Sequence, residues 1–286
     1  MRIWKHVDSV DEIACGEASS FSNFLLQIGN GTLPVHGDIG TKMIELPNQI
    51  CLDGDDPKEL LYEIYGLPET WNVESTCNKA IVCAKNVDVD RINAIALELF
   101  PGEEKIYRSI DSVSDRERET EMYAVEFLNS LTPSGMPQHK LRLKVGCTVM
   151  LMRNLNVSSG LANGTRLTIL RMHSHVLEAQ IVNGSHKGTI TMIPRITLNS
   201  TESELPFTLK RLQFPIRLAA AMTINKSQGQ SLDAVGIYLK DPVFSHGQLY
   251  VAILREGSLS CIRIMGAKKV QNQLYTLNIV YRDVLK

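Results

Sequence analysis

The amino-acid sequence predicts an α/β fold, in which a parallel sheet flanked by helices carries a small inserted β-barrel. Two observations predict this arrangement. Strand-like and helical patterns alternate at residues 80–100 and again from 214 onwards. Between them, short β-rich runs follow one another at close intervals, with turn residues in the gaps. The order of these patterns indicates one α/β domain that is interrupted by a β module.

The first predicted strand is "AIVCA" at residues 80–84, and a predicted helix follows it at residues 88–100. The apolar positions of this helix recur at helical spacing, at Val89, Ile92, Ala96 and Leu99. Lys85 and Asn86 form the turn between strand and helix. Residues 102–140 are polar and contain Pro133, Gly135 and Pro137. We interpret them as a surface excursion and a boundary.

Four strands are predicted in the middle segment, at residues 145–153, 165–172, 176–182 and 188–198. Asn-Gly pairs at 163–164 and 183–184 supply the positive φ that tight hairpins require. About sixty residues of such strands favour a small closed barrel of the SH3 or OB kind, because closure removes exposed sheet edges.

The α/β pattern resumes after residue 205. A strand leading into a turn is predicted at 214–221, a buried strand at 234–239, and a helix from 246 to about 255. Ser245 and Gln248 have the spacing of a capping box at the start of that helix. Adjacent Ser245 and His246 do not indicate a nucleophile and its base, because neighbouring residues seldom face each other and no third member is evident.

Composition limits the classes of protein that the chain represents. Its 286 residues carry a net charge of −1, and its six cysteines show no C-x-x-C spacing. Neither a disulfide framework nor a metal site is predicted, and a reducing, intracellular compartment fits best. Charges interrupt the apolar stretches, so no membrane span is expected.

Charge is distributed unevenly along the chain. Residues 139–195 contain eight Lys/Arg and a single acid, Glu178. Such an excess suits contact with a phosphate backbone, or else it is the solvated rim of a barrel. The same region offers no base-stacking platform, because residues 141–198 contain no Phe, Tyr or Trp.

The segment "TINKSQGQS", residues 223–231, is a polar insert between an apolar run and a strand. It is not a P-loop, because Lys226 precedes Gly229, and the sequence contains no G-x-x-x-x-G-K-[ST]. Its hydrogen-bonding side chains stand at the end of a strand, where open α/β sheets bind their ligands. Phosphate or base contacts would suit them. The alternative is a polar turn with a helix cap.

Two further positions carry alternatives of the same kind. Lys85-Asn86 also follows a strand, although Asn86 would serve equally as an N-cap. Arg255 lies near the end of a predicted helix, where a cation favours the helix dipole regardless of function. Its functional interpretation is an arginine finger that stabilises charge on a transferring phosphoryl group.

Three stretches closely resemble the C-terminal half of Pif-type DNA helicases, especially those of Helitron-like transposons. They are residues 143–169, 214–239 and 242–255, and looser matches occur at 21–32, 86–105 and 126–137. The resemblance implies a superfamily-one motor that moves 5′ to 3′ on single-stranded DNA. It also implies two RecA-like domains with ATP and Mg²⁺ between them, and an SH3-like module inserted in the second.

The resemblance also implies domain limits. Residues 1–35 would be a remnant of the first RecA-like domain. Residues 36–140 and 206–286 would form the two parts of the second RecA-like domain. Residues 141–205 would be the inserted SH3-like module.

Residue roles follow from the same resemblance. DNA contact is implied for Lys85, Asn86, Thr223, Asn225, Lys226 and Ser227. Nucleotide contact is implied for Gln228, Gly229 and Ser231, and catalytic contact with the γ-phosphate for Arg255 and Arg2. Two departures from the family pattern lie beside the arginine finger. Leu254 replaces a hydroxyl residue, and Glu256 adds a negative charge that could pair with Arg255 and hold it away from ATP.

Walker A and Walker B motifs are absent from the sequence. We therefore expect a truncated gene model, a decayed transposon copy or one half of a split enzyme, with an N-terminal RecA-like domain as the missing partner. Such a fragment would not bind ATP or Mg²⁺ tightly and would not hydrolyse ATP alone. The alternative function is a non-catalytic module that binds single-stranded nucleic acid. Family resemblance predicts a nuclear location.

Overall fold

The computed structural model describes residues 12–114, 123–201, 205–255 and 258–284, which fall into two compact units. The first unit is formed by residues up to Leu67, Asn78–Ala96 and Ala221 onwards, and the second by Pro68–Cys77 and Leu97–Ala220. The predicted α/β class is confirmed, and the parallel sheet lies in the first unit.

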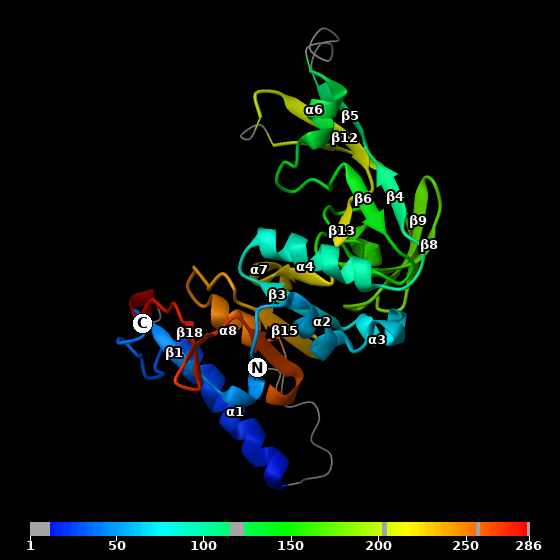
Figure 1. Ribbon diagram of the computed structural model, residues 1–286. Coiled ribbons are helices and arrows are strands. Elements are labelled where there is room, and N and C mark those ends of the chain that lie inside the picture. The colour runs from blue at the N-terminus through cyan, green and yellow to red at the C-terminus, as the bar shows by residue number, and fades with distance from the viewer. Residues whose placement is uncertain (1–11, 115–122, 202–204, 256–257, 285–286) are drawn as a thin grey trace. The chain divides into compact units, whose positions relative to one another are not determined.

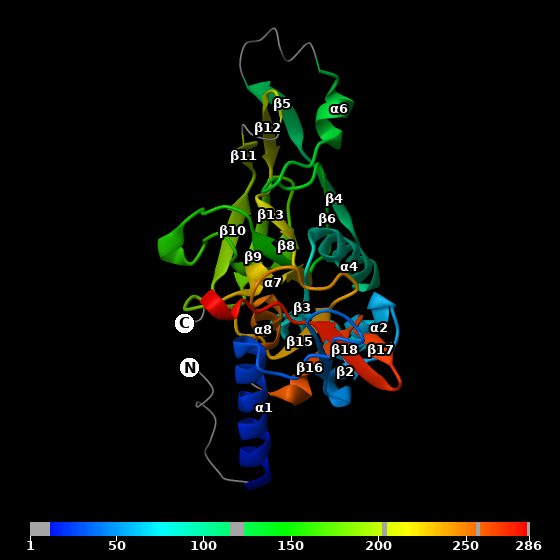
Figure 2. The same ribbon diagram turned by 90° about the vertical axis from the view of Figure 1, so that its left-hand side faces the viewer.

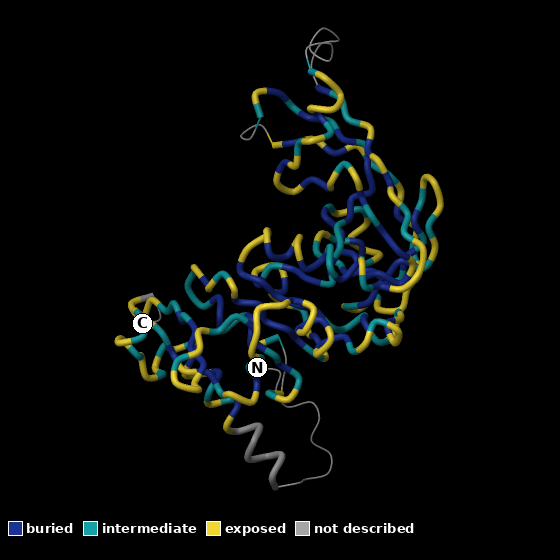
Figure 3. Tube along the Cα trace, in the orientation of Figure 1, coloured by how far each residue is buried: buried dark blue, intermediate teal, exposed yellow. Residues whose placement is uncertain are grey.

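The parallel sheet has five strands in the order β14-β3-β15-β16-β2, all parallel. Figure 1 labels its central strands β3 and β15. Their bounds are β2 (Cys51–Leu52), β3 (Lys79–Cys83), β14 (Ala221–Thr223), β15 (Ala234–Tyr238) and β16 (Ile262–Met265). In β3 and β15 every residue after the first is buried, as expected for strands that are covered on both faces. Figure 3 shows these central strands as buried.

Helices α2 (Pro57–Tyr65), α4 (Asn86–Leu99), α7 (Ile224–Ser227) and α8 (Gln248–Ile253) pack on this sheet, and α1 (Glu12–Asn30) packs on α8. Helix α2 begins where the Asp56 side chain accepts a hydrogen bond from Lys58 N, with Pro57 as its first residue. It packs closely on β15 because Gly236 has no Cβ. A Cβ there would lie 3.0 Å from side-chain carbons of Ile64 and Ile81.

A second, antiparallel sheet in the first unit has the order β1-β18-β17. Its strands are β1 (Met43–Leu46), β17 (Lys268–Val270) and β18 (Gln273–Leu277), and the short 3₁₀ turns of the unit are η1 (Asn48–Ile50), η4 (Leu259–Cys261) and η5 (Arg282–Val284). Helix α1 packs against α8, and the Asn278 amide donates to Ile28 O. The described part of residues 1–35 therefore packs as part of this unit, and its origin in the first RecA-like domain stays a prediction.

The second unit is built from antiparallel strands (Figure 2). Its sheets have the orders β10-β9-β8-β7-β13, β11-β12-β5 and β4-β6. The strands are β4 (Lys105–Arg108), β5 (Ile110–Ser114), β6 (Lys140–Leu143), β7 (Thr148–Leu151), β8 (Arg166–Met172), β9 (Val176–Ile181), β10 (Ile190–Pro194), β11 (Ile196–Asn199), β12 (Thr208–Gln213) and β13 (Ile216–Leu218). The short helical elements are η2 (Pro68–Thr70), α3 (Val73–Thr76), α6 (Val125–Ser130) and η3 (Val157–Ser159).

The structure modifies three expectations for this unit. Among the described residues β10 and β13 are the edges of the five-stranded sheet, so closure into an SH3-like barrel remains a prediction. The strand predicted at 188–198 divides at Arg195 into β10 and β11, which belong to different sheets. Residues 102–140 are not a surface excursion. They contribute β4, β5, α6 and β6, and their Tyr107 and Leu128 side chains are buried in the unit.

The structure also divides the chain after residue 220 instead of residue 205. Strand β12 pairs with β5 and β11, and β13 pairs with β7, so both strands belong to the second unit. A local sequence pattern predicts that a strand forms, but it does not say with which strand it pairs. Residues 206–220 thus pack with the second unit, and the domain limit at 205 that the resemblance implies stays a prediction.

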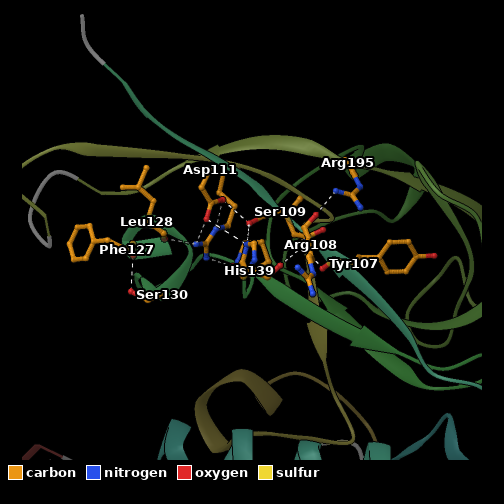
Figure 4. A network of polar contacts seen from close by, with 12 residues as sticks. Tyr107, Arg108, Ser109, Asp111, Phe127, Leu128, Ser130, His139 and Arg195 are labelled. Carbon is orange, nitrogen blue, oxygen red and sulfur yellow. Dashed lines mark hydrogen bonds and ion pairs between the residues drawn. The ribbon is translucent and has the colours of Figure 1, made fainter. Parts of the chain in front are cut away.

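A buried ion pair joins the strands of the second unit (Figure 4). Arg211 on β12 donates two hydrogen bonds to Asp111 on β5, at 2.9 Å from Nε and 2.6 Å from Nη2, and both side chains are fully buried. Asp111 also accepts a hydrogen bond from Ser109 Oγ at 2.7 Å. Such a bidentate pair satisfies two charges that would be unfavourable alone in the interior.

The same guanidinium organises the chain around it. Arg211 donates to Pro137 O at 3.0 Å and to Leu128 O at 3.1 Å, so it fixes the segment before β6 and the end of α6. His139 lies beside this pair, with Nδ1 at 2.8 Å from Ser109 Oγ. Burial lowers the pKa of His139, although the Asp111 carboxylate opposes that effect.

Asp111→Asn should destabilise the second unit by about 3–5 kcal/mol, because it leaves the Arg211 charge buried without its partner. The matched control is Glu104→Gln, which breaks the partly exposed Arg142–Glu104 pair and should reduce stability by no more than about 1 kcal/mol. The measurement is urea unfolding followed by Trp71 fluorescence in a Trp4→Phe background. Equal losses for both variants would contradict this interpretation.

Candidate nucleic-acid interface

Parallel pairing brings three chain segments to one edge of the first unit's sheet. Thr223, the last residue of β14, is in register with Cys83, the last residue of β3, and Cys83 is in register with Tyr238, the last residue of β15. Because all three strands point the same way, the segments that follow them emerge side by side. Those segments are 84–88, 224–231 and 239–247.

Asn93 fixes β14 at the side of this sheet. Its Nδ2 donates to Ala221 O at 3.0 Å, and its Oδ1 accepts from Ala221 N at 2.8 Å. The side chain is buried. The sequence pattern did not single out this residue, although a polar residue beside the apolar positions Val89, Ile92 and Ala96 was a visible signal. Asn93 thus connects the helix after β3 to the strand that leads into the 223–231 turn.

The 223–231 segment forms the short helix α7 followed by a turn. Asn225, Lys226, Gln228, Gly229 and Ser231 are exposed, and Thr223 is partly exposed. Gly229 has a φ of 82°, which side-chain-bearing residues seldom adopt, so glycine suits this turn. The polar side chains of this segment are at least partly exposed to solvent, apart from that of Ser227.

Ser227 differs from its neighbours. Its side chain is fully buried, and its hydroxyl donates to Ile224 O at 2.7 Å. The hydroxyl therefore closes the α7 turn and does not face solvent. This position does not fit the implied contact with DNA, because the donor is already used and is covered by protein.

Arg255 binds the backbone of the same turn. Its Nη1 donates to Ser227 O at 3.1 Å and to Gln230 O at 3.3 Å, while Nε donates to Val251 O at 2.9 Å. Burial lowers the pKa of this guanidinium from its high ordinary value. The arginine that was implied to contact phosphate is thus directly connected to the 223–231 turn.

The segment after β3 carries Lys85 and Asn86, both exposed. Lys85 Nζ lies 3.0 Å from Asp241 Oδ1, which joins this segment to the one after β15. Asn86 is the first residue of α4, so the helix begins with it rather than after it. Asp88, two residues further on, is buried. Its burial raises its pKa, and the nearby Asp241 carboxylate raises it further.

The basic segment 139–195 is used mostly inside its own unit. Lys144 is buried and donates to Phe100 O at 2.5 Å, and Arg166 is 1% exposed and donates to Ala219 O at 3.3 Å. Other basic residues have acidic or backbone partners, namely Arg142 with Glu104, Arg153 with Met152 O, Arg171 with Glu178 and Arg195 with Arg108 O. Lys140 and Lys187 are exposed. The basic side chains of this segment therefore do not form a continuous surface for a phosphate backbone, and they are not all solvated side chains at a barrel rim.

Two residues singled out in the sequence lie outside the described residues. They are Arg2 and Glu256, so the structure says nothing of the second arginine or of a pairing between Glu256 and Arg255.

Only one of the two hydrogen bonds of the predicted capping box is formed. Gln248 Oε1 accepts from Ser245 N at 3.4 Å, but the N-cap of α8 is Gly247, with a φ of 68° and no side chain.

In the described part of the chain, no cluster of His, Cys, Asp and Glu could hold a metal ion. In the same residues, no helix is long and apolar enough to cross a membrane.

Comparison with known proteins supports the architecture and defines a class. A family model described as "DNA helicase Pif1, 2B domain" matches residues 126–172. The chain is 32% identical over 203 residues to the ATP-dependent DNA helicase PIF1 of Xenopus laevis, covering 70% of this chain and 30% of that protein. It is 35% identical over 187 residues to the same helicase of Rattus norvegicus, covering 64% of this chain and 27% of that protein.

Solved structures show the same fold. A Pif1 structure that addresses DNA unwinding at forked double-stranded DNA has a TM-score of 0.56 at 22% identity, covering 93% of this chain and 50% of that one. Pif1 from Bacteroides in complex with ADP-AlF3 and single-stranded DNA has a TM-score of 0.52 at 24% identity, covering 80% and 49%.

The sequence matches define the class as that of DNA helicase domains, and the solved structures show the same fold with its parallel sheet. Within that class the chain is of the Pif type and corresponds to the C-terminal part of these helicases. It spans about a third of the length of the curated relatives.

Asn93→Leu should lower the free energy of unfolding of the first unit by about 1–3 kcal/mol, because it leaves Ala221 N–H and C=O without their partner. Asn23→Leu, at an exposed position of α1, is the control and should change stability by less than about 0.5 kcal/mol. Urea unfolding followed by circular dichroism measures both. If both variants were equally stable, Asn93 would not hold β14 in place.

Proposed function

We propose that this chain is the C-terminal lobe of an ATP-dependent DNA helicase, and that the carboxyl edge of its parallel sheet holds single-stranded DNA. The observation that carries the proposal is the register of β14, β3 and β15, which gathers Lys85, Asn86, Asn225 and Lys226 along one edge. Cationic and amide side chains are the groups that bind phosphate oxygens and base edges.

The Arg255 contacts supply a physical route between nucleotide and DNA. A phosphate group that approached Arg255 would compete with Ser227 O and Gln230 O for the guanidinium. Loss of those bonds would free the backbone of the turn that carries Asn225 and Lys226. Binding of a phosphate group at Arg255 would thereby change the position of the DNA-facing donors Asn225 and Lys226. Movement 5′ to 3′ is the direction that the family resemblance implies.

The residues present fit one side of an ATP site. Gln228, Gly229 and Ser231 expose polar groups on the turn that Arg255 binds, and such donors suit phosphate oxygens. A P-loop and its lysine normally cradle the β- and γ-phosphates, with Mg²⁺ held nearby. No such motif occurs in this sequence, so the first RecA-like domain of the family would supply those ligands.

A non-catalytic nucleic-acid-binding module remains the alternative. Its main support was the basic segment 139–195, and most of that charge is now seen in internal contacts. The two functions differ in which residues hold DNA. Nuclear residence stays a prediction from family resemblance, and localisation of the tagged chain tests it.

Binding of single-stranded DNA should weaken steeply with salt, because phosphate contacts release counterions. Lys226→Gln should weaken binding and reduce the slope of log K against log salt by about 0.7. Lys187→Gln, at an exposed position of the basic segment, is the matched control and should leave both unchanged. Fluorescence anisotropy with labelled oligothymidylate measures these quantities. The reverse pattern would favour the alternative module.

ATP turnover by the isolated chain should not exceed background, with or without single-stranded DNA, because the phosphate cradle is absent from its sequence. A coupled ATPase assay measures it, with Arg255→Ala as the comparison. Turnover that the Arg255→Ala change abolished would show that this chain builds a complete site alone.

A further inference from the structure

Proteins that bind single-stranded nucleic acid usually stack bases on exposed aromatic rings, as well as attracting the backbone with charge. The side chains proposed above to hold DNA, Lys85, Asn86, Asn225 and Lys226, offer charge and amides but no ring. Among the described residues, the most exposed aromatic side chains are Phe244, at 58%, and Tyr281, at 51%. Both belong to the first unit, and Phe244 lies in the 239–247 segment that leaves the carboxyl end of β15.

His246, two residues after Phe244, forms a stacked pair with Tyr281. Their ring centroids are 5.6 Å apart, and the two ring planes differ by 13°. Tyr281 N donates to His246 Nδ1 at 3.0 Å. Because Nδ1 accepts this bond, the neutral imidazole carries its proton on Nε2, which leaves Nε2–H as a donor.

The side chain of Lys42 lies over the Tyr281 ring of this stacked pair. Lys42 Nζ lies 5.1 Å from the centroid of the Tyr281 ring. Lys42 has a φ of 62°, a conformation that residues other than glycine, asparagine and aspartate seldom adopt. The backbone holds it there, since Asn278 N donates to Lys42 O at 3.0 Å. A cation is thus kept at the ring.

Three distant segments are fixed together around these side chains. Gly247 N donates to Ile279 O at 2.9 Å, which joins the segment after β15 to the segment after β18. Arg282 donates to Gly31 O, so the segment after α1 is attached to the same place. Lys42 and Arg282 are two cations of the segments that meet here, and cations attract phosphate.

This group of residues continues the interface along the sheet. The order β14-β3-β15 sets the turn at 223–231, the Lys85 segment and the 239–247 segment next to one another. The Lys85–Asp241 ion pair joins the last two. A strand of DNA that follows the edge from Lys226 past Lys85 would next meet the segment that carries Phe244.

We propose that Phe244, His246, Tyr281 and Lys42 form a nucleobase-binding platform for single-stranded DNA. Phe244 stacks on a base, His246 Nε2–H donates to a base edge or a phosphate oxygen, and Lys42 neutralises the adjacent phosphate. Tyr281 positions the His246 ring. The platform rests on the proposed function, because it extends the same DNA edge, and it adds the stacking contact that residues 141–198 do not offer.

Phe127 provides the comparison. It is 45% exposed, yet its ring packs 6.0 Å from Tyr123 and 6.5 Å from Phe207, and these rings cover the core beneath α6. It belongs to the second unit and lies beside Glu126, a carboxylate that disfavours phosphate. An exposed ring in that position completes a hydrophobic core and is a suitable control.

The test compares two oligonucleotides of equal length and charge, one of thymidylate and one of abasic sites. Phe244→Ala should weaken binding to the thymidylate strand by about 5- to 150-fold and leave binding to the abasic strand unchanged. Lys42→Asn, which suits the left-handed backbone, should weaken binding to both strands equally. Phe127→Ala should change neither. Thermal unfolding of each variant confirms that it is folded.

The outcomes separate this proposal from the proposed function. If the unmodified chain bound neither strand, the proposed DNA-binding function itself would fail. If it bound both, and Phe244→Ala left the preference for thymidylate intact, the platform would be wrong while the DNA edge stood. A Phe244→Ala effect of equal size on both strands would likewise overturn base stacking.

Discussion

Parallel pairing of β3 with both of its neighbours is the constraint on which the candidate site depends. Thr223, Cys83 and Tyr238 form one row across the sheet, so the three segments that follow them share an edge. An antiparallel neighbour would send its segment to the opposite edge. Gly236 allows α2 to press on β15, and Asn93 holds β14 beside β3. Packing in the core therefore determines which polar groups meet at the surface.

The Arg255 contacts show how one side chain serves stability and function together. The guanidinium satisfies backbone carbonyls at the end of a short helix, which is a structural role. An anion that competed for the guanidinium would break these bonds and would thereby release the backbone of the 223–231 turn. A residue that was expected to face only a nucleotide is thereby connected to the exposed Asn225 and Lys226. The polar insert is both a helical turn and a candidate ligand surface.

Local sequence patterns predicted much of the first unit and less of the second. The strand at 80–84, the helix after it and the strand at 234–239 follow from spacing and turn residues alone, because each depends on near neighbours. Partners of β12 and β13 could not be predicted, since antiparallel pairing depends on distant residues. Burial of Lys144 and Arg166 was also missed. Charge counts along a chain do not show whether a cation faces solvent or a backbone carbonyl.

The most direct measurement is hydrogen–deuterium exchange of the chain with and without single-stranded oligothymidylate. The carboxyl-edge account predicts slower amide exchange in peptides that cover 84–88 and 223–231, with little change across 139–195. Protection confined to 139–195 would contradict it, because DNA would then lie on the second unit and the alignment of β14, β3 and β15 would have no part in binding.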